Sequence, residues 1–300
     1  MPLVDRALDL ALDAMRFAYH RTPLPAVLRK LSREDQGVVE TRHVESLTGR
    51  PYRVITRAGH DAGKAAPALF ALHAYSSTSD IVLDGLRLRR RAAYRRGFVL
   101  VVPEGTRDAT GNPFWNATAG CSGCAPRTRT DDLGYLRAVL AQVRGQFAID
   151  PAHVYAIGVS NGAFMAARWA AEPGGDLRAI ACLSGGGLGP EDPPYRPSVP
   201  VRVLQIHGTL DDEVLFDGGQ GPNGAYPSVL ETIAAWRSTC KVNGEPRSER
   251  WRSLLQGPTH RQTWHGENGD VALWVVEGGG HHLYGVRWMM DDVLDFLVAP

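Results

Sequence analysis

Short apolar runs alternate along the chain with longer segments in which apolar residues recur every three or four positions. The short runs predict strands, and the helical period of the longer segments predicts helices. Apolar strands that alternate with helices are typical of the α/β class, in which a mostly parallel sheet has helices on both faces. The predicted strands span 38–46, 51–58, 66–73, 98–103, 153–160, 178–185, 201–208 and 271–278, and the predicted helices span 85–97, 131–147, 161–172, 227–240 and 286–299.

The first 35 residues carry a separate pattern. Apolar residues at helical spacing between positions 3 and 19 predict a helix that Pro23 and Pro25 end. Such a stripe most simply docks on a domain, and a lid or a membrane-surface helix are the alternatives. Neither a repeat nor a low-complexity linker divides the sequence. We therefore predict a single domain over 1–300, with 1–35 as an N-terminal helical extension.

Acidic residues bear on the expected location of the protein. Asp5, Asp9 and Asp13 fall where a secretory signal would be uninterrupted and apolar. As given, the sequence predicts a cytoplasmic protein. A secreted protein whose leader has been removed would show the same N-terminal pattern, so secretion is the alternative. No apolar run approaches the roughly 20 residues that a membrane span needs, so no span is predicted.

The charges of the chain nearly cancel. Lys and Arg number 33 and Asp and Glu number 32, which gives a formal net charge of +1. No global field would gather nucleic acid or an anionic membrane, so the expected partner is neutral or small. One predicted helix, 85–97, nevertheless contains six arginines: Arg87, Arg89, Arg90, Arg91, Arg95 and Arg96. The neutral charge balance of the chain favours a solvated helix face over a nucleic-acid site.

Four cysteines are too few for a disulfide scaffold. Cys121 and Cys124 form a C-x2-C, but no second ligand pair stands at matching spacing, so we predict no metal and no cofactor. Free or oxidised loop cysteines are the simpler interpretation of this pair. Cys182 and Cys240 are expected to be packed thiols.

Residues Gly158 to Gly162 fit the G-x-S-x-G pattern of a nucleophile elbow, with Ser160 at its centre. A predicted strand precedes the serine and a predicted helix follows it. In such a turn, a side chain two residues before or two residues after the serine would clash with the backbone, which explains Gly158 and Gly162. The helix N-terminus places positive dipole near the hydroxyl, where negative charge develops in acyl transfer.

A serine nucleophile needs a base and an acid. In folds with a nucleophile elbow, the three residues follow along the chain in the order serine, acid, histidine. His281 comes directly after a predicted strand and a glycine triplet. His260 and His265 lack such a strand and are expected on exposed loops. The acid should follow the strand 201–208, where Asp211 and Asp212 stand side by side.

The oxyanion hole requires two N–H groups. We expect one from Asn161, which follows the serine. We expect the other from Tyr75, in the segment LHAYSS after the strand 66–73.

Eight segments, from about Leu69 to Gly285, together resemble the poly(3-hydroxybutyrate) depolymerase-like esterases. This α/β-hydrolase group also includes feruloyl and acetyl xylan esterases. The segments are LHAYSS, FVLVVPEGT, FWNA, DDLGYL, IDPAHVYAIGVSNGAFMA, VLQIHGTLD, YPSVLETIAAW and GGGHHLYG.

The resemblance implies an α/β-hydrolase fold with Ser160 as nucleophile, His281 as base and Asp211, two residues after Thr209, as the acid. It also suggests Trp115 and Asn116 as a wall of the substrate cleft, although a tryptophan packed under a long loop fits equally well. Further candidates for substrate binding are His73, Tyr226, His282 and Tyr284.

Three positions depart from the family pattern. Ala74 replaces a glycine, Asn161 replaces the glycine or alanine that usually follows the nucleophile, and GGGHHLYG lacks the usual tryptophan. These changes weaken the case for polymer degradation and leave ester chemistry intact, so the expected substrate is a small-molecule or a polymer ester.

The sequence therefore predicts a cofactor-independent serine esterase that acts through an acyl-enzyme on short-chain, hydroxyalkanoate or aryl esters. A peptidase or thioesterase with the same triad is one alternative. A non-catalytic binding protein on a hydrolase scaffold is the other.

Overall fold

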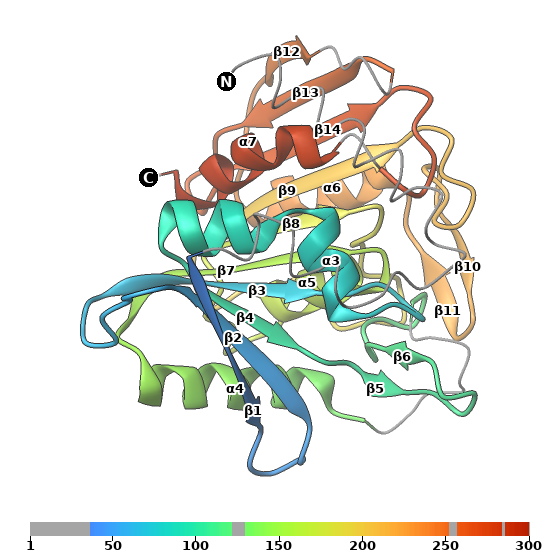
Figure 1. Cartoon of the computed structure of the whole chain (residues 1–300). Helices are drawn as coiled ribbons and strands as arrows, with labels where there is room; N and C mark the ends of the chain where they lie inside the picture. The colour runs from blue at the N-terminus through green and yellow to red at the C-terminus, as the bar shows by residue number, and fades with distance from the viewer. Residues whose placement is uncertain (1–36, 122–129, 252–256, 284–285, 300) are drawn as a thin grey trace. The chain divides into compact units, whose positions relative to one another are not determined.

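A computed structural model describes residues 37–121, 130–251, 257–283 and 286–299, with side chains left undescribed at 286–288 (Figure 1). The predicted N-terminal extension, with its helix, lies outside the described residues. Within those that are described, no helix is long and apolar enough to cross a membrane.

A sheet of ten strands forms the centre of the fold, in the order β1-β2-β4-β3-β7-β8-β9-β14-β13-β12. The run from β4 to β14 is parallel, whereas β1 and β2 on one edge and β13 and β12 on the other are antiparallel. The predicted mostly parallel α/β sheet is therefore confirmed. The strands are β1 Val38–Val44, β2 Pro51–Arg57, β3 Ala66–Leu72, β4 Val99–Pro103, β7 Ile149–Val159, β8 Ala179–Leu183, β9 Arg202–Gly208, β12 Arg247–Trp251, β13 Thr259–Trp264 and β14 Val271–Val276.

Helices cover both faces of this sheet, and each face has its own apolar core. One core joins the sheet to α4 (Asp132–Gln146), α5 (Asn161–Ala171) and α6 (Val229–Thr239). The other joins it to α3 (Ser79–Gly85), the π-helical segment η2 (Arg89–Tyr94) and α7 (Val286–Val298). Two small hairpins complete the fold: β5 (Thr106–Arg107) with β6 (Pro113–Phe114), and β10 (Gly219–Gly221) with β11 (Gly224–Tyr226).

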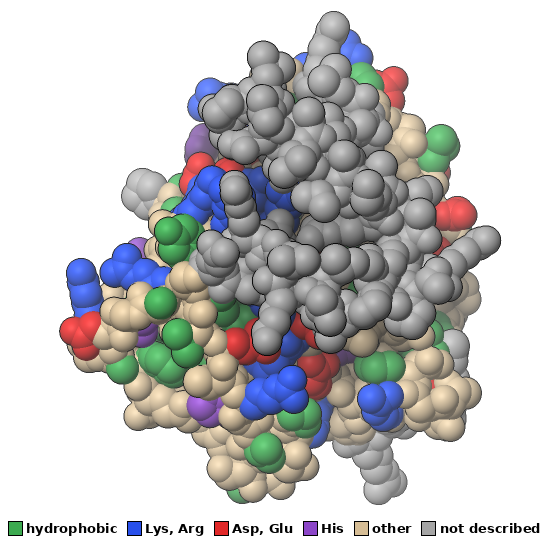
Figure 2. Space-filling view, viewed as in Figure 1, with side chains coloured by type: hydrophobic (Ala, Val, Ile, Leu, Met, Phe, Trp, Pro, Cys, Tyr) green, Lys and Arg blue, Asp and Glu red, His purple; other side chains and the backbone are tan. Residues whose placement is uncertain are grey.

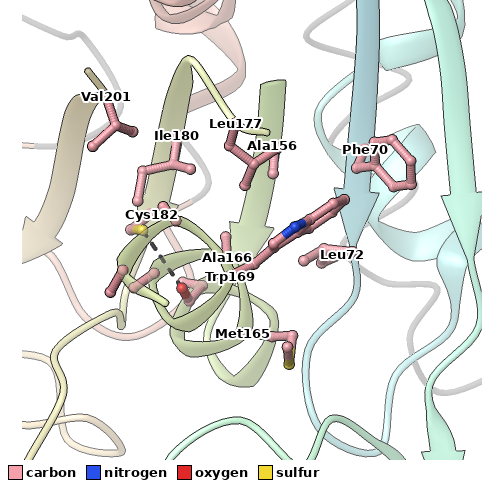
Figure 3. Close-up of a cluster of buried hydrophobic side chains, with 14 of the residues drawn as sticks. Phe70, Leu72, Ala156, Met165, Ala166, Trp169, Leu177, Ile180, Cys182 and Val201 are labelled. Atoms are coloured by element: carbon pink, nitrogen blue, oxygen red, sulfur yellow. Dashed lines mark hydrogen bonds between the residues drawn. The ribbon is translucent and has the colours of Figure 1, made fainter. Parts of the chain in front are cut away.

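Helix α5 is buried along nearly its whole length. Trp169 projects from it across β3 and β7 and meets the ring of Phe70 edge-on, with centroids 4.9 Å apart (Figure 3). Small residues such as Ala166 let the helix approach the sheet closely. This packing fixes the helix whose N-terminus follows Ser160.

The structure corrects the expectation for the arginine-rich segment. The predicted helix 85–97 is instead the end of α3 followed by η2, and of its six arginines only Arg95 is exposed, so they do not form a solvated face. Arg87 is buried, and Arg91 and Arg96 both pair with Asp291 of α7. Arg89 pairs with Asp80, Asp84 and Glu40. Arg89, Arg91 and Arg96 therefore pair with carboxylates of the same chain. Figure 2 shows basic and acidic side chains close to one another on the face that it presents.

Two strands near the C-terminus were not predicted. His260 lies on β13, not in a loop, because β12 and β13 pair as an antiparallel extension of the sheet. Their sequences are mostly polar, and the residues of β12 are almost all exposed. A polar edge strand lacks the apolar signal by which strands are recognised. His265 follows β13 and is exposed, as expected.

The described cysteines are free thiols. Cys182 and Cys240 are fully buried, which confirms that they are packed thiols, and burial raises the pKa of each to about 12. Cys121 is half-buried, and Cys124 lies outside the described residues.

We predict that Trp169→Ala lowers the free energy of unfolding by about 3–5 kcal/mol, because it removes a buried indole and leaves a cavity under α5. Urea denaturation followed by circular dichroism measures the change. Leu230→Ala on α6, where the side chain is 59% exposed, is the control and should change stability by less than about 0.5 kcal/mol. Equal stability of the two variants would contradict this role of Trp169.

Candidate active site

Ser160 occupies a strained turn between β7 and α5. Its backbone has φ +52° and ψ −120°, a conformation that non-glycine residues rarely adopt. A Cβ at Gly158 would lie 2.1 Å from the carbonyl oxygen of Gly162, and one at Gly162 would lie 2.4 Å from that of Leu72. The turn therefore requires glycine at both positions, for the reason the motif suggested.

The parallel strands end together beside this turn. Val159 of β7 pairs with Leu183 of β8, and Val276 of β14 pairs with Gly208 of β9. The segments after β7, β8, β9 and β14 consequently leave the sheet at one edge, the carboxyl edge of the parallel strands. This is the edge at which open α/β sheets bind ligands.

Ser184, which follows β8, connects the serine turn to the histidine loop. The Ser160 N–H donates to the carbonyl of Leu183 over 2.8 Å. The hydroxyl of the next residue, Ser184, donates to the carbonyl of His281 over 2.8 Å. Ser160 and His281 are thus both attached to the end of β8. Each is almost buried, with 8% and 6% of its surface exposed.

His281 and Asp211 form a direct pair. Nδ1 of His281 lies 3.0 Å from both carboxylate oxygens of Asp211. Asp211 is buried, whereas Asp212 is exposed, so the structure places Asp211 against the histidine, as the resemblance implied.

The Asp211 carboxylate has further donors. Oδ1 accepts the N–H groups of Glu213 and Val214, and Nε2 of His207 lies 3.1 Å from Oδ2. Burial opposes ionisation, but the hydrogen bonds from His207, His281 and Val214 together hold the pKa of Asp211 well below its usual range. Asp211 therefore stays ionised.

The charge of Asp211 acts on His281. Burial disfavours the imidazolium, but the hydrogen bond and charge of Asp211 and the nearby charges of Glu213 and Asp212 outweigh it and raise the pKa of His281 above its usual value. Nε2 of His281, on the other side of the ring, lies 3.6 Å from Oε2 of Glu213. His281 is consequently paired through Nδ1 and faces a partly exposed carboxylate at Nε2.

Glycines let the histidine loop close against β9. A Cβ at Gly208 would lie 2.1 Å from the carbonyl of Gly279, so no side chain fits there. The Leu210 N–H donates to that same carbonyl over 2.8 Å, and the Gly278 N–H donates to the Thr209 hydroxyl over 2.9 Å. These bonds join the segment that carries Asp211 to the segment that carries His281.

The two expected oxyanion donors lie on tightly held segments. Asn161 begins α5, and the first N–H groups of a helix have no acceptor within it. Tyr75 is held by its phenol, which donates to Asp108 over 2.7 Å. Hydrogen bonds to Asp108 from Thr110, Tyr75 and Asn112 outweigh desolvation and lower its pKa to about 2, so this acceptor stays ionised.

The structure corrects the assignment of His73 to substrate binding. The side chain is fully buried, and its two ring nitrogens bond backbone groups, Nδ1 with the Ala74 carbonyl and Nε2 with the Gly105 N–H. Burial lowers the pKa of His73. His73 therefore braces the segment that carries Tyr75.

Trp115 also lies in the core, which agrees with the packed alternative and not with a cleft wall. It has no exposed surface, and its indole donates to the carbonyl of His73 over 3.0 Å. Its backbone N–H donates to Oδ1 of Asn161, whose Nδ2 donates back to the Trp115 carbonyl. Trp115 thus bridges the segment after β3 and the start of α5.

Asn116 is half-buried and likewise bonded within the protein. Its N–H donates to Asp132 over 2.6 Å and its side-chain amide donates to the carbonyl of Thr130. Asp132 is fully buried and pairs with Arg50 over 2.5 Å. These bonds join the residues directly after β6 to the start of α4.

The remaining substrate candidates lie nearer the surface. His282 is exposed and meets the ring of His281 edge-on, with centroids 5.5 Å apart. Tyr226 is half-buried, packs edge-on against Phe164, and accepts a hydrogen bond from Leu215. Tyr284 lies outside the described residues.

The sequence reasoning missed three residues that hold the site. Ser184 follows a predicted strand and Asp108 lies in a D-x-T-x-N turn, and neither carries a catalytic pattern. His207 stands in VLQIHGTLD, a segment singled out only for its aspartate. Among the described residues, no cluster of three or more His, Cys, Asp or Glu side chains could hold a metal ion.

No protein-family model matches the chain. NocK of Nocardia uniformis subsp. tsuyamanensis, which is named as an esterase, is 30% identical over 253 residues, covering 77% of this chain and 70% of that protein. Feruloyl esterase C of Emericella nidulans is 27% identical over 183 residues, covering 60% of this chain and 61% of that protein. The solved acetyl xylan esterase from Aspergillus awamori has the same fold, with a TM-score of 0.55 at 13% identity over 84% of this chain and 98% of that one.

The similarity to NocK extends over most of both proteins, and the feruloyl esterases are similar over a shorter length. The sheet order and the shared fold agree with it. The chain therefore belongs to the α/β-hydrolase esterases related to NocK and the feruloyl esterases, and it is an ester-hydrolysing enzyme.

Proposed function

We propose that the protein is a serine esterase in which Ser160, His281 and Asp211 form the catalytic triad. The observation that carries the proposal is the His281–Asp211 pair, anchored through Ser184 to the strand end that also binds Ser160. The strained serine turn supports it, because it places the Ser160 hydroxyl at the tip of a strand and at the start of a helix.

The reaction begins with attack of Ser160 Oγ on the ester carbonyl while its proton passes to Nε2 of His281. Asp211 stabilises the imidazolium through Nδ1, and the N–H groups of Asn161 and Tyr75 bind the oxyanion. Collapse of the tetrahedral intermediate breaks the bond to the alcohol, which takes the proton from His281. Water then attacks the acyl-enzyme, gives its proton to His281, and releases the acid as the Ser160 hydroxyl re-forms.

The substrates we propose are short-chain, hydroxyalkanoate or aryl esters without negative charge. Leu210 and Leu215 flank the Asp211 segment and are 69% and 46% exposed, which offers apolar surface next to that segment. Glu213 and Asp212 place negative charge there, which opposes anionic substrates. Relatives named as feruloyl and acetyl xylan esterases support carboxylic esters as the class.

We predict that Ser160→Ala abolishes nearly all hydrolysis of p-nitrophenyl esters from acetate to decanoate, because it removes the nucleophile. Initial rates of purified wild type and variant measure the loss. Ser248→Ala, on the exposed edge strand β12, is the matched control and should retain the wild-type rate. Equal rates for Ser160→Ala and the control would refute the triad.

Asp211→Asn and Asp212→Asn form a matched pair of neighbouring changes. Loss of the charge on Asp211 should lower kcat by roughly 10⁴-fold, the effect known for the triad acid of another serine hydrolase. Asp212 is exposed, so its variant should keep most of the activity. Steady-state kinetics on p-nitrophenyl acetate separates the two. A larger loss in the Asp212 variant would move the acid to that position.

The pH dependence follows from the raised pKa of His281. Only neutral imidazole accepts the serine proton, so kcat/KM should fall on acidification with a midpoint above 6.5, the ordinary histidine value. Glu213→Gln removes one charge that favours the imidazolium, and the midpoint should move to lower pH.

Glu267→Gln is the control for this shift, since Glu267 lies between β13 and β14, at the opposite end of β14 from His281. Its kcat/KM profile should coincide with that of the wild type. A midpoint in Glu213→Gln that stays in place or rises would contradict the assigned role of Glu213.

A further inference from the structure

A second histidine touches the proposed triad acid. His207 lies at the end of β9 and is 1% exposed. Its Nε2 is 2.8 Å from the carbonyl oxygen of Val214 and 3.1 Å from Oδ2 of Asp211. One ring nitrogen therefore faces both the carboxylate and the backbone turn that follows it.

The neighbours of His207 determine which ring nitrogen carries the proton. Nε2 of Gln205 donates to the carbonyl of Gly185 over 2.8 Å, which orients the amide so that its nitrogen also lies 3.3 Å from Nδ1 of His207. An amide nitrogen only donates, so Nδ1 must accept. The carbonyl of Val214 only accepts, so Nε2 must carry a proton. His207 is thus fixed as an Nε2–H donor.

This donor acts at the segment that presents Asp211. The N–H groups of Glu213 and Val214 fold back onto Oδ1 of Asp211, so the carboxylate and residues 211–214 form one closed turn. The bond from His207 to the Val214 carbonyl attaches that turn to β9. The same nitrogen contacts Oδ2, while Nδ1 of His281 approaches the carboxylate over 3.0 Å.

We propose that His207 is a positioning residue for ester hydrolysis: it holds the Asp211 turn and carboxylate in the orientation that His281 requires. The inference rests on the proposed triad. The polar contacts of His207 that the structure describes are with Gln205, Val214 and Asp211, so its effect on the reaction passes through Asp211. Because the Asp211–His281 bond matters most when the imidazolium forms, loss of His207 should lower kcat and leave KM nearly unchanged.

The main experiment compares His207→Leu and His207→Gln, with p-nitrophenyl acetate as substrate. Leucine removes the donor, and the misplaced acid should lower kcat by about 100-fold. A glutamine amide can place its Nε2 where the imidazole Nε2 lies. The kcat of His207→Gln should therefore be at least about tenfold higher than the kcat of His207→Leu. Urea unfolding of each variant records whether the fold persists.

His153→Leu is the matched control. His153 bonds Asp150 over 2.8 Å near the start of β7, away from the carboxyl edge of the sheet, so this variant removes another histidine–aspartate contact without touching the site. It should keep the wild-type kcat.

The wild type provides a test that does not depend on a stable variant. In protein labelled with ¹⁵N-histidine, the His207 ring should show a protonated Nε2 and an unprotonated Nδ1. The opposite tautomer would leave no donor towards Val214 and Asp211 and would overturn the proposal.

The kinetic outcomes separate this proposal from the triad itself. If Ser160→Ala is as active as wild type, the triad is wrong and His207 has no role to play. If Ser160→Ala is inactive while folded His207→Leu keeps wild-type kcat, the triad stands and the His207 proposal fails. It also fails if the leucine and glutamine variants lose kcat equally, or if KM alone rises.

Discussion

The buried charge of Asp211 is the constraint on which the carboxyl edge of the sheet depends. A carboxylate removed from water is strongly destabilising unless donors surround it. Here Glu213 and Val214 supply backbone N–H groups and His207 and His281 supply ring nitrogens. Each donor comes from the end of β9, from the segment that follows it, or from the loop after β14. The need to surround this charge with donors therefore brings the segment after β9 and the loop after β14 together.

The second constraint is the tight turn at Ser160. Gly158 and Gly162 leave no room for a Cβ, because α5 approaches the ends of β3 and β7 within backbone contact. The packing of Trp169 against Phe70 holds the helix in this position. The strain at the serine is thus sustained by the core beneath it, and the proposed nucleophile depends on the same packing that stabilises the fold.

Polar side chains that would be expected to meet a ligand are used here for support. His73, Trp115 and the Asn161 amide form one connected set of hydrogen bonds between the segment after β3 and the start of α5. Both expected oxyanion donors belong to these two segments. The side-chain hydrogen bonds of this set therefore hold the two segments from which we expect the oxyanion donors.

The sequence by itself determined the alternation of strands and helices, the serine turn and the order of serine, acid and histidine, since periodicity and glycine spacing are local properties. It could not choose between Asp211 and Asp212 without a resemblance, because adjacent residues differ only in the direction in which they point. It placed His260 in a loop, because a polar edge strand has little apolar signal. Only the tertiary structure decided that Trp115 and His73 are buried, that Arg89 and Arg91 pair with acids of other elements, and that His207 reaches Asp211. These contacts join strand ends and helices far apart in the chain, and burial exists only after the sheet has brought them together.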